Sequence, residues 1–381
     1  MKKLIRITTV PSSLLGLLTG QLKFMSDYYK IIGVSSTGDK LRQVRENEGI
    51  ETHAIDMTRS ISPIKDLIAT YKLYKFLIKE KPDIVHTHTP KAGTLGMLAA
   101  KLARVPHRLH TIAGLPLLEA RGMKRKLLDT VEKITYSCAT HILPNSYGLK
   151  SIILENNFTN PSKLKVIGNG SSNGIDTSYF DIKLFSDETR QELRKELNIN
   201  ENDIVFVFIG RMVKDKGLNE LAQAFDELSK MNSNCKLIFV GPREDHLDPL
   251  SPETENIIET NQQIVSVGFQ QDVRPFLAIA HVLVHPSYRE GFPNVVLQAS
   301  SMKLPCIVTN INGSNEIIEH DTNGLIVPVK DFSSLKNAME NLIKNPENRL
   351  KMSKNSRPRI KKYYEREFVW KELLNFYNNL Y

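Results

Sequence analysis

The segment His285 to Met302, HPSYREGFPNVVLQASSM, places one carboxylate directly before a predicted helix. Val282 to Val284 ends an apolar run of strand length, and Pro286 to Gly291 has the composition of a loop. From Asn294 onward, apolar residues recur at helical spacing. The unpaired N–H groups of such a helix start predict a site for an anion such as phosphate. Glu290 only accepts hydrogen bonds, so it is better suited to a sugar hydroxyl.

An ordinary structural role for Glu290 is also open. An acidic residue before a helix often serves only as a cap or as a partner of the helix dipole, which stabilises a helix by about 0.3–1 kcal/mol. This segment alone does not decide between the two interpretations.

A second segment, GRMVKDKG at residues 210–217, follows the apolar run Ile204–Ile209. Gly210 and Gly217 bracket Arg211 and Lys216 at the carboxyl end of this predicted buried strand. Glycine lets a ligand approach the backbone, arginine offers a fork of donors and lysine a mobile charge. A solvated basic loop explains the two cations equally well in isolation. Together with a helix start in the same sheet, they predict a diphosphate site.

The elements that must position these residues alternate between strand and helix. Such alternation predicts an α/β protein with doubly wound parallel sheets, whose ligands bind at the carboxyl ends of the strands. A chain of 381 residues exceeds the size of one growing core, which predicts two domains. We expect one domain over residues 1–173, a second over 174–358, and a terminal helix over 359–381 that packs back on the first. A strand is also predicted at Leu164 to Ile167.

The amino-acid composition indicates the class of protein, its cellular compartment and the charge of its partner. The apolar fraction of 41% and the charged fraction of 24% are typical of globular proteins, and no apolar run is long enough to cross a bilayer. The three cysteines lie far apart without metal-ligand spacing, which indicates free thiols and predicts a cytoplasmic protein. Residues 1–180 carry a net charge of +12 within a chain of net charge +9, so we expect the first half to meet an anionic partner.

One basic segment precedes an apolar helix face and could rest on the inner face of an anionic cytoplasmic membrane. A solvated charge cluster on a helix that packs into the core is an equally good interpretation. The basic residues of this segment are Arg121, Lys124, Arg125 and Lys126.

GRMVKDKG, followed later by EGFPNVVLQA, resembles the retaining glycosyltransferases of family 4, which have the GT-B fold. The resemblance covers nearly the whole chain. Four further segments share it, namely DIVHTHTPKAG at 83–93, PNS at 144–146, NGID at 173–176 and INGSNEII at 311–318. The resemblance implies two Rossmann-like domains that face each other across a cleft. It further implies transfer of a sugar from a nucleoside-diphosphate donor, such as UDP-N-acetylhexosamine, with retention of configuration. The implied acceptor is a saccharide on a polyprenyl diphosphate or a similar glycan of bacterial polysaccharide synthesis, and no nucleic acid is involved.

The resemblance also implies roles for individual residues. Glu290 would bind hydroxyls of the donor sugar, while Arg211 and Lys216 would hold the diphosphate and stabilise it as it leaves. Gln298 stands where the family usually has a second glutamate that binds the ribose, and glutamine can still accept that hydrogen bond. The donor-binding residues would be Gly210, Arg243, Gly268, Phe269, Gly291, Phe292, Pro293, Asn294 and Gln298.

The first domain departs from the family pattern, because Ala113 stands where a histidine often reaches the donor sugar. His88, His110 and Ser12 remain candidates for the acceptor side, although a structural role is at least as good an interpretation for the histidines. The chain has no Asp-x-Asp pair, so we expect no metal and no other cofactor. A sugar-nucleotide 2-epimerase of the same fold and a non-catalytic partner that binds nucleotide sugars remain alternatives.

Overall fold

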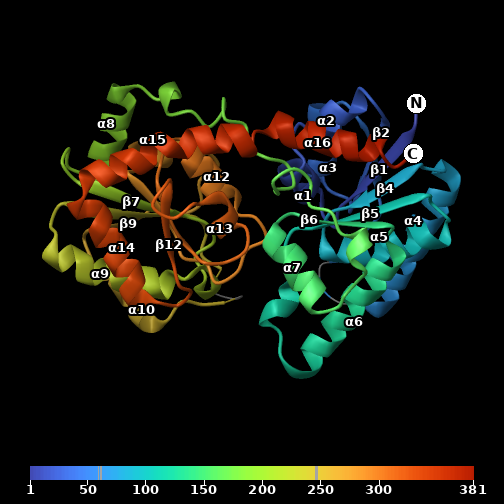
Figure 1. Ribbon diagram of the computed structural model, residues 1–381, viewed down its shortest axis with the longest axis horizontal. Helices are drawn as coiled ribbons and strands as arrows, with labels where there is room; N and C mark the ends of the chain where they lie inside the picture. Colours follow the sequence, from blue (N-terminus) through green and yellow to red (C-terminus); the bar gives the residue numbers. More distant parts are fainter. Residues whose placement is uncertain (59, 61, 245–247) are drawn as a thin grey trace. The chain divides into compact units, whose positions relative to one another are not determined.

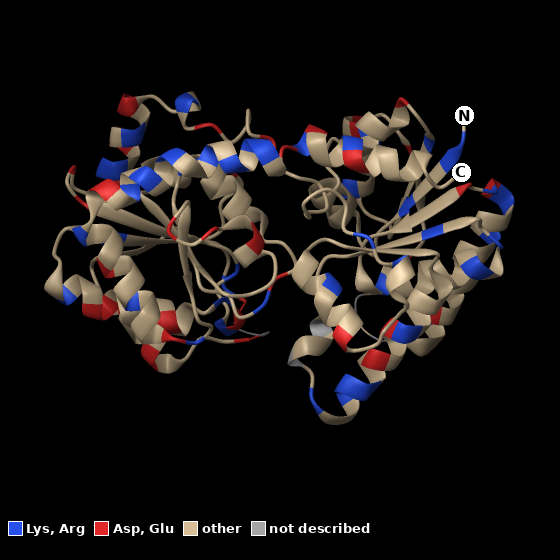
Figure 2. Ribbon diagram, viewed as in Figure 1, with Lys and Arg blue, Asp and Glu red and all other residues tan. Residues whose placement is uncertain are grey.

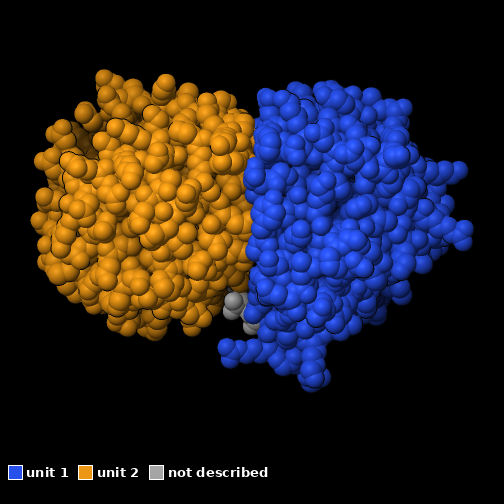
Figure 3. Space-filling view, viewed as in Figure 1, with its two compact units in different colours: residues 1–174, 366–381 blue, residues 175–365 orange. Residues whose placement is uncertain are grey.

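The computed structural model of the protein describes residues 1–58, 60, 62–244 and 248–381. The chain forms two compact units, coloured separately in Figure 3. Unit 1 comprises Met1–Gly174 and Arg366–Tyr381, and unit 2 comprises Ile175–Glu365. No helix in the described ranges combines the length and the apolar character that a membrane crossing needs.

Unit 1 is built on a parallel sheet of order β3-β2-β1-β4-β5-β6. Its strands are β1 Lys3–Ile7, β2 Lys30–Ser35, β3 Glu51–Ala54, β4 Ile84–Thr87, β5 His107–Ile112 and β6 His141–Pro144. Its helices are α1 Pro11–Leu17, α2 Gln21–Ser26, α3 Asp39–Glu48, α4 Pro63–Glu80, α5 Pro90–Leu102, α6 Gly122–Cys138, α7 Tyr147–Glu155 and α16 Arg366–Asn378, with 3-10 turns at Pro116–Glu119 and Pro161–Lys163.

Unit 2 repeats this plan with the parallel order β12-β11-β10-β7-β8-β9. Its strands are β7 Ile204–Ile209, β8 Cys235–Val240, β9 Ile264–Ser266, β10 Val282–His285, β11 Cys306–Thr309 and β12 Gly324–Val327. Its helices are α8 Asp187–Glu196, α9 Leu218–Met231, α10 Pro252–Thr260, α11 Arg274–Ile279, α12 Asn294–Ser301, α13 Ser314–Ile317, α14 Phe332–Lys344 and α15 Pro346–Tyr363, with 3-10 turns at Ile182–Leu184 and Lys214–Lys216.

Both sheets are covered by helices on their two faces (Figure 1). Strand β7 illustrates why, because every second residue of a strand points to the same face. Val205 and Val207 belong to a core with α12 and α15, whereas Phe206 and Phe208 belong to a core with α9 and α14. A strand buried on both faces reads as an uninterrupted apolar run, which is the pattern of Ile204–Ile209. The predicted pair of doubly wound domains is confirmed.

In each unit the strand order reverses direction between two central strands. This switch point lies between β1 and β4 in unit 1, and between β7 and β10 in unit 2. In doubly wound proteins, ligands bind beside the carboxyl ends of the strands at such a switch point.

Two local predictions were wrong. Leu164 to Ile167 is not a strand: only an isolated bridge joins Leu164 to Ile142, and it lies beyond the edge strand β6. The sequence also predicts one helix over residues 359–381, whereas the structure has the end of α15 and a separate α16. The break falls at Tyr364 and Glu365, because the Tyr364 carbonyl accepts a hydrogen bond from the Ile175 N–H at 2.9 Å.

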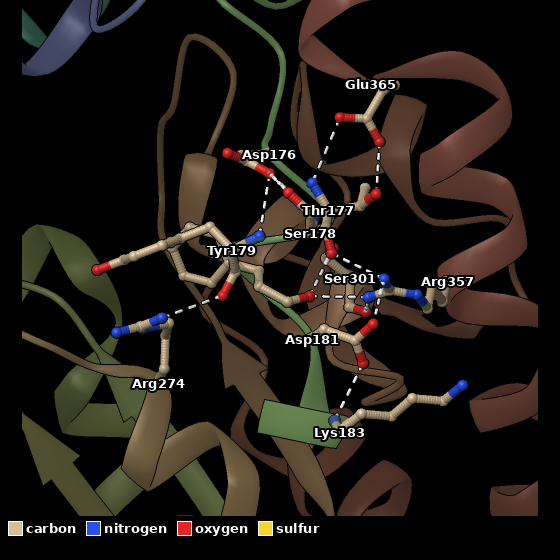
Figure 4. A network of polar contacts seen from close by, with 11 residues as sticks. Asp176, Thr177, Ser178, Tyr179, Asp181, Lys183, Arg274, Ser301, Arg357 and Glu365 are labelled. Carbon is tan, nitrogen blue, oxygen red and sulfur yellow. Dashed lines mark hydrogen bonds and ion pairs between the residues drawn. The ribbon is translucent and has the colours of Figure 1, made fainter. Parts of the chain in front are cut away.

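The first residues of unit 2 contact α15 and Glu365, the second residue after that helix (Figure 4). The Glu365 carboxylate accepts from the hydroxyl and N–H of Thr177. The Arg357 guanidinium donates to the Asp181 carboxylate at 2.8 Å and to the Phe180 and Thr177 carbonyls at 2.8 and 2.7 Å. The chain therefore enters and leaves unit 2 through one hydrogen-bonded cluster.

Candidate functional site

The loop after β7 lies at the switch point of unit 2. The Arg211 guanidinium forms an ion pair with Glu244 at 2.8 Å, and its side chain is 43% exposed. Residues Lys214–Lys216 make a 3-10 turn, and Gly217, at φ 74°, is the N-cap residue before α9. A Cβ atom at Gly217 would lie 2.1 Å from the Pro286 carbonyl oxygen. Glycine is therefore required there by both its backbone angle and this close approach.

The loop after β10 packs directly on the loop after β7. Strand β10 pairs with β7, with Leu283 opposite Val207. The Asp215 carbonyl accepts from the Tyr288 N–H at 2.9 Å, and the Asp215 carboxylate pairs with Arg289 at 2.8 Å. These contacts fix the path of the loop that carries Glu290.

Glu290 is the centre of the site. Its Oε1 atom lies 2.5 Å from the Lys216 Nζ and 3.0 Å from the His285 Nε2, and its side chain is 17% exposed. Burial alone would raise the pKa of Glu290, but the hydrogen bond from His285 and the charge of Lys216 outweigh it and lower the pKa to about 2. Oε2 has no hydrogen-bond partner within the described ranges. The carboxylate is thus ionised and held through one oxygen, which leaves the other to accept from a ligand.

Helix α12 begins at Asn294, and the extended residue Pro293 immediately precedes it. No side chain caps this helix start in the part of the chain that the structure describes, and its first turn has no acidic residue. Phe292 is buried against Tyr364, so only its backbone can serve a ligand. Gln298 lies one turn into α12 and is half-buried. The helix start can therefore receive an anion.

A third loop supports the backbone around Glu290. The Asn312 side-chain amide donates to the Glu290 carbonyl and, at 3.3 Å, to the Gly291 carbonyl. Gly313, at φ 78°, precedes α13, and a Cβ there would lie 2.5 Å from the Gly291 carbonyl oxygen. The INGSNEII segment thus holds the loop in place.

The loops after β8 and β9 carry the remaining predicted donor-binding residues. Arg243 is exposed and forms an ion pair with Glu255. The Met212 N–H donates to the Pro242 carbonyl at 2.8 Å, so this loop lies beside that of Arg211. Gly268 accepts from the Gly241 N–H at 2.8 Å, and Phe269 is 71% exposed. An exposed ring beside consecutive strand ends can stack on a planar base.

His285 and Asn312 were missed as site residues in the sequence. His285 ends the strand that leads into the Glu290 loop, and this position at a strand end was the feature of the sequence that could have indicated its role. Its ring is 2% exposed and stacks on Phe208 with centroids 6.3 Å apart. Asn312 lies in the INGSNEII segment that shares the family likeness, but its contact with the Glu290 loop could not be read from the sequence, because the two are 22 positions apart.

The acceptor-side candidates lie in unit 1. His88 is buried, and its Nε2 accepts from the Arg6 Nε at 2.8 Å. His110 is buried against Gly93 and bonds the Thr87 hydroxyl at 2.8 Å. Burial lowers the pKa of both rings, that of His110 to about 4, so both are neutral at neutral pH. Ser12 is exposed on the first turn of α1.

Over residues 1–58, 60, 62–244 and 248–381, no three His, Cys, Asp or Glu side chains form a group that could hold a metal ion.

Two family models match the chain. Residues 189–359 match the model of the glycosyl transferases group 1, and residues 31–170 match the glycosyl transferase 4-like domain.

Relatives with curated names extend over most of the chain. A capsular polysaccharide biosynthesis glycosyltransferase, CapM, of Staphylococcus aureus is 34% identical over 99% of this chain and 97% of its own length. A UDP-Gal:alpha-D-GlcNAc-diphosphoundecaprenol alpha-1,3-galactosyltransferase of Escherichia coli is 31% identical over 80% of this chain and 77% of its own length. The crystal structure of Anabaena Alr3699/HepE in complex with UDP superposes with a TM-score of 0.80 over the full length of both chains, at 17% identity.

Proposed function

Because the chain belongs to the group 1 glycosyl transferases, we propose that it transfers a sugar from a nucleoside-diphosphate donor to a hydroxyl of a saccharide carried on a polyprenyl diphosphate. The proposed donor is a UDP-N-acetylhexosamine, the reaction retains the anomeric configuration, and no metal takes part. The proposed setting is bacterial polysaccharide synthesis. The contact between Lys216 and Glu290 at the switch point of unit 2 is the observation that carries the proposal.

That contact joins two chemically different halves of a donor site. Lys216 and Arg211 supply positive charge for a diphosphate, and the start of α12 supplies N–H groups. Glu290 Oε2 accepts hydrogen bonds from sugar hydroxyls, next to the cation that holds the phosphates. Gln298 binds the ribose, and the Gly268–Phe269 loop with Arg243 surrounds the base.

The proposed reaction breaks the bond between the anomeric carbon and the diphosphate oxygen. A new bond forms on the same face between that carbon and the acceptor oxygen, and the acceptor proton passes to the departing diphosphate. Lys216 and Arg211 stabilise the negative charge that develops on the leaving group, in place of a metal ion. Glu290 holds the sugar in the orientation for this attack, and positioning of this kind accounts for much of enzymatic rate enhancement.

Two relatives support the acceptor and the setting. The Escherichia coli relative is named for an acceptor on diphosphoundecaprenol, and the Staphylococcus aureus relative for capsular polysaccharide. The Anabaena structure, which shares the fold, contains UDP. An acceptor of this kind resides in a membrane.

Peripheral attachment to an anionic membrane is part of the proposal. Lys124 and Lys126 are exposed on the first turns of α6, whereas Arg125 is engaged by Asp129 and Asn156 at 2.6 and 2.8 Å. We therefore expect Lys124→Glu with Lys126→Glu to weaken binding to phosphatidylglycerol vesicles at low salt. Unchanged binding would remove this part of the proposal.

A thermal-shift screen of nucleotide sugars, followed by a transfer assay, tests the function. The true donor should raise the melting temperature most. With that donor and N-acetylglucosaminyl-diphosphate-farnesol, we expect a product whose anomeric configuration, read by NMR, matches the donor. An isomerised donor formed without acceptor would identify an epimerase instead. Donor binding without turnover on any prenyl-linked saccharide would identify a non-catalytic partner.

A further inference from the structure

Unit 1 contains a pocket that the donor site does not use. Its volume is about 580 Å³, within the range of small-molecule pockets. It lies between α5 and α6, and the lining is mainly apolar. Residues that line it include Thr9, Thr89, Leu95, Leu117, Leu128 and Val131.

The pocket opens at the switch point of unit 1. Thr9 follows β1, and Thr89 follows β4, the two strands between which the order reverses. Their hydroxyls are 2.7 Å apart. Ligands of doubly wound domains bind at such a switch point, so the topology and the position of the pocket point to the same place.

The apolar wall leads from the interior of unit 1 to its surface along α6. Leu117 and Leu95 are buried, Leu128 and Val131 are half-buried, and Leu127 is 50% exposed. Met123, one turn before Leu127, is 88% exposed. Met123 therefore lies at the surface, beside the end of the apolar wall that Leu127 forms.

Three charged side chains, Asp66, Lys91 and Glu132, line the pocket. Lys91 lines the pocket but is already paired with Asp66 at 2.6 Å. Glu132 also lines it, and burial raises the pKa of that carboxyl group. Lys124 and Lys126 lie outside it, exposed on the first turns of α6, and Figure 2 shows basic residues at this end of the helix. These bases complement an anionic membrane at the end where the apolar wall reaches the surface.

We infer that this pocket binds the isoprenoid chain of the polyprenyl-diphosphate-linked acceptor. The saccharide end lies toward Thr9 and Thr89, and the chain runs between α5 and α6 and leaves past Leu127 and Met123. The inference rests on the proposed function and deepens it, because it assigns the lipid part of the acceptor to a defined place. A chain held in this way gives the enzyme a preference for prenyl-linked over free saccharides.

A substitution that fills the pocket with a larger side chain tests this inference. Val131→Trp places a large ring among the lining residues, and Ile134→Trp is the matched control, since Ile134 is 48% exposed on the same helix and does not line the pocket. Wild-type enzyme should show a KM at least about tenfold lower for N-acetylglucosaminyl-diphosphate-farnesol than for the methyl-diphosphate analogue, because only the former buries a chain. Val131→Trp should remove this difference and leave the KM of the donor unchanged. Ile134→Trp should retain it.

A binding measurement without sugar transfer distinguishes an error in the assigned lipid site from an error in the proposed transferase activity. By calorimetry, wild type should bind farnesyl diphosphate more tightly than inorganic diphosphate, and Val131→Trp should lose that preference at an unchanged melting temperature. If folded Val131→Trp binds farnesyl diphosphate and uses the farnesyl acceptor as wild type does, the pocket does not hold the chain. If wild type binds farnesyl diphosphate through the pocket but transfers no sugar, the proposed activity fails while the lipid site stands.

Discussion

The substitution Glu290→Gln should remove a stabilisation of unit 2 that depends on pH. Burial by itself would raise the pKa of Glu290, yet the hydrogen bond from His285 and the charge of Lys216 lower it from 4.5 to about 2. A carboxyl group with a lowered folded-state pKa stabilises the fold above its unfolded pKa, here 4.5, and that contribution is lost as the pH falls toward 2. At 1.36 kcal/mol for each pKa unit, the contribution is about 3 kcal/mol above pH 4.5 and roughly half of that at pH 3.

Scanning calorimetry of the full-length protein measures the effect. For a unit of this size, 1 kcal/mol corresponds to about 2–4 °C, so Glu290→Gln should lower the melting temperature of unit 2 by about 6–12 °C at pH 7. The gap between wild type and variant should shrink to about half by pH 3, since wild type loses the contribution that the variant never had.

The matched control is Glu319→Gln in the same unit. Glu319 pairs with Arg359 at 2.9 Å, but its side chain is 56% exposed, and ion pairs at such positions contribute only about 0–1 kcal/mol. The melting temperature of Glu319→Gln should therefore differ little from that of wild type at both pH 7 and pH 3. A gap for Glu290→Gln that is equally large at pH 7 and pH 3 would refute the reasoning, because the stabilisation would not depend on ionisation of this carboxylate.

Four further outcomes are expected. Arg211→Ala should lower kcat/KM by about 10²–10³ without changing the melting temperature by more than a few degrees, as steady-state kinetics will show, because its exposed side chain acts on the leaving group and not on the fold. Gly217→Ala should cost at least about 1–3 kcal/mol of stability in urea unfolding, since it combines φ 74° with an approach of 2.1 Å to the Pro286 carbonyl oxygen. His285→Leu should raise the pKa of Glu290, so that the loss of stability below pH 4.5 is smaller than in wild type and ends at a higher pH in the calorimetric series; a loss as large as that of wild type would contradict the assigned hydrogen bond. Dialysis against EDTA should leave the transfer rate unchanged, and a rate restored only by added Mg²⁺ or Mn²⁺ would contradict the role of the two cations.

The strand, loop and helix that form the donor site could each be predicted from the sequence. Ile204–Ile209 is buried on both faces and therefore reads as an apolar run, and the loop and helix that follow His285 are visible in composition and spacing. The family resemblance read from GRMVKDKG and EGFPNVVLQA is confirmed by the family matches and by the named glycosyltransferase relatives. The roles of the individual site residues remain predictions.

Periodicity was a weaker guide to which face of a helix is buried. Apolar residues recur at helical spacing in the segment that forms α4, Pro63–Glu80. Yet Ile64, Leu67 and Tyr71 are exposed, and Ala69, Leu73 and Leu77 meet the core. The spacing of apolar residues specifies that a helix forms, while the neighbours on the sheet decide which stripe of it is covered.

By itself, the sequence determined the strands, the helices and the glycines of the site, because these follow from burial patterns and backbone preferences within a few residues. Only the tertiary structure decided that Lys216 and Glu290, which are 74 positions apart, share one carboxylate oxygen with His285. That meeting depends on β10 lying beside β7 in the sheet, and strand order is set by packing over the whole unit. The same holds for the pocket between α5 and α6, whose walls come from segments that no local pattern places together.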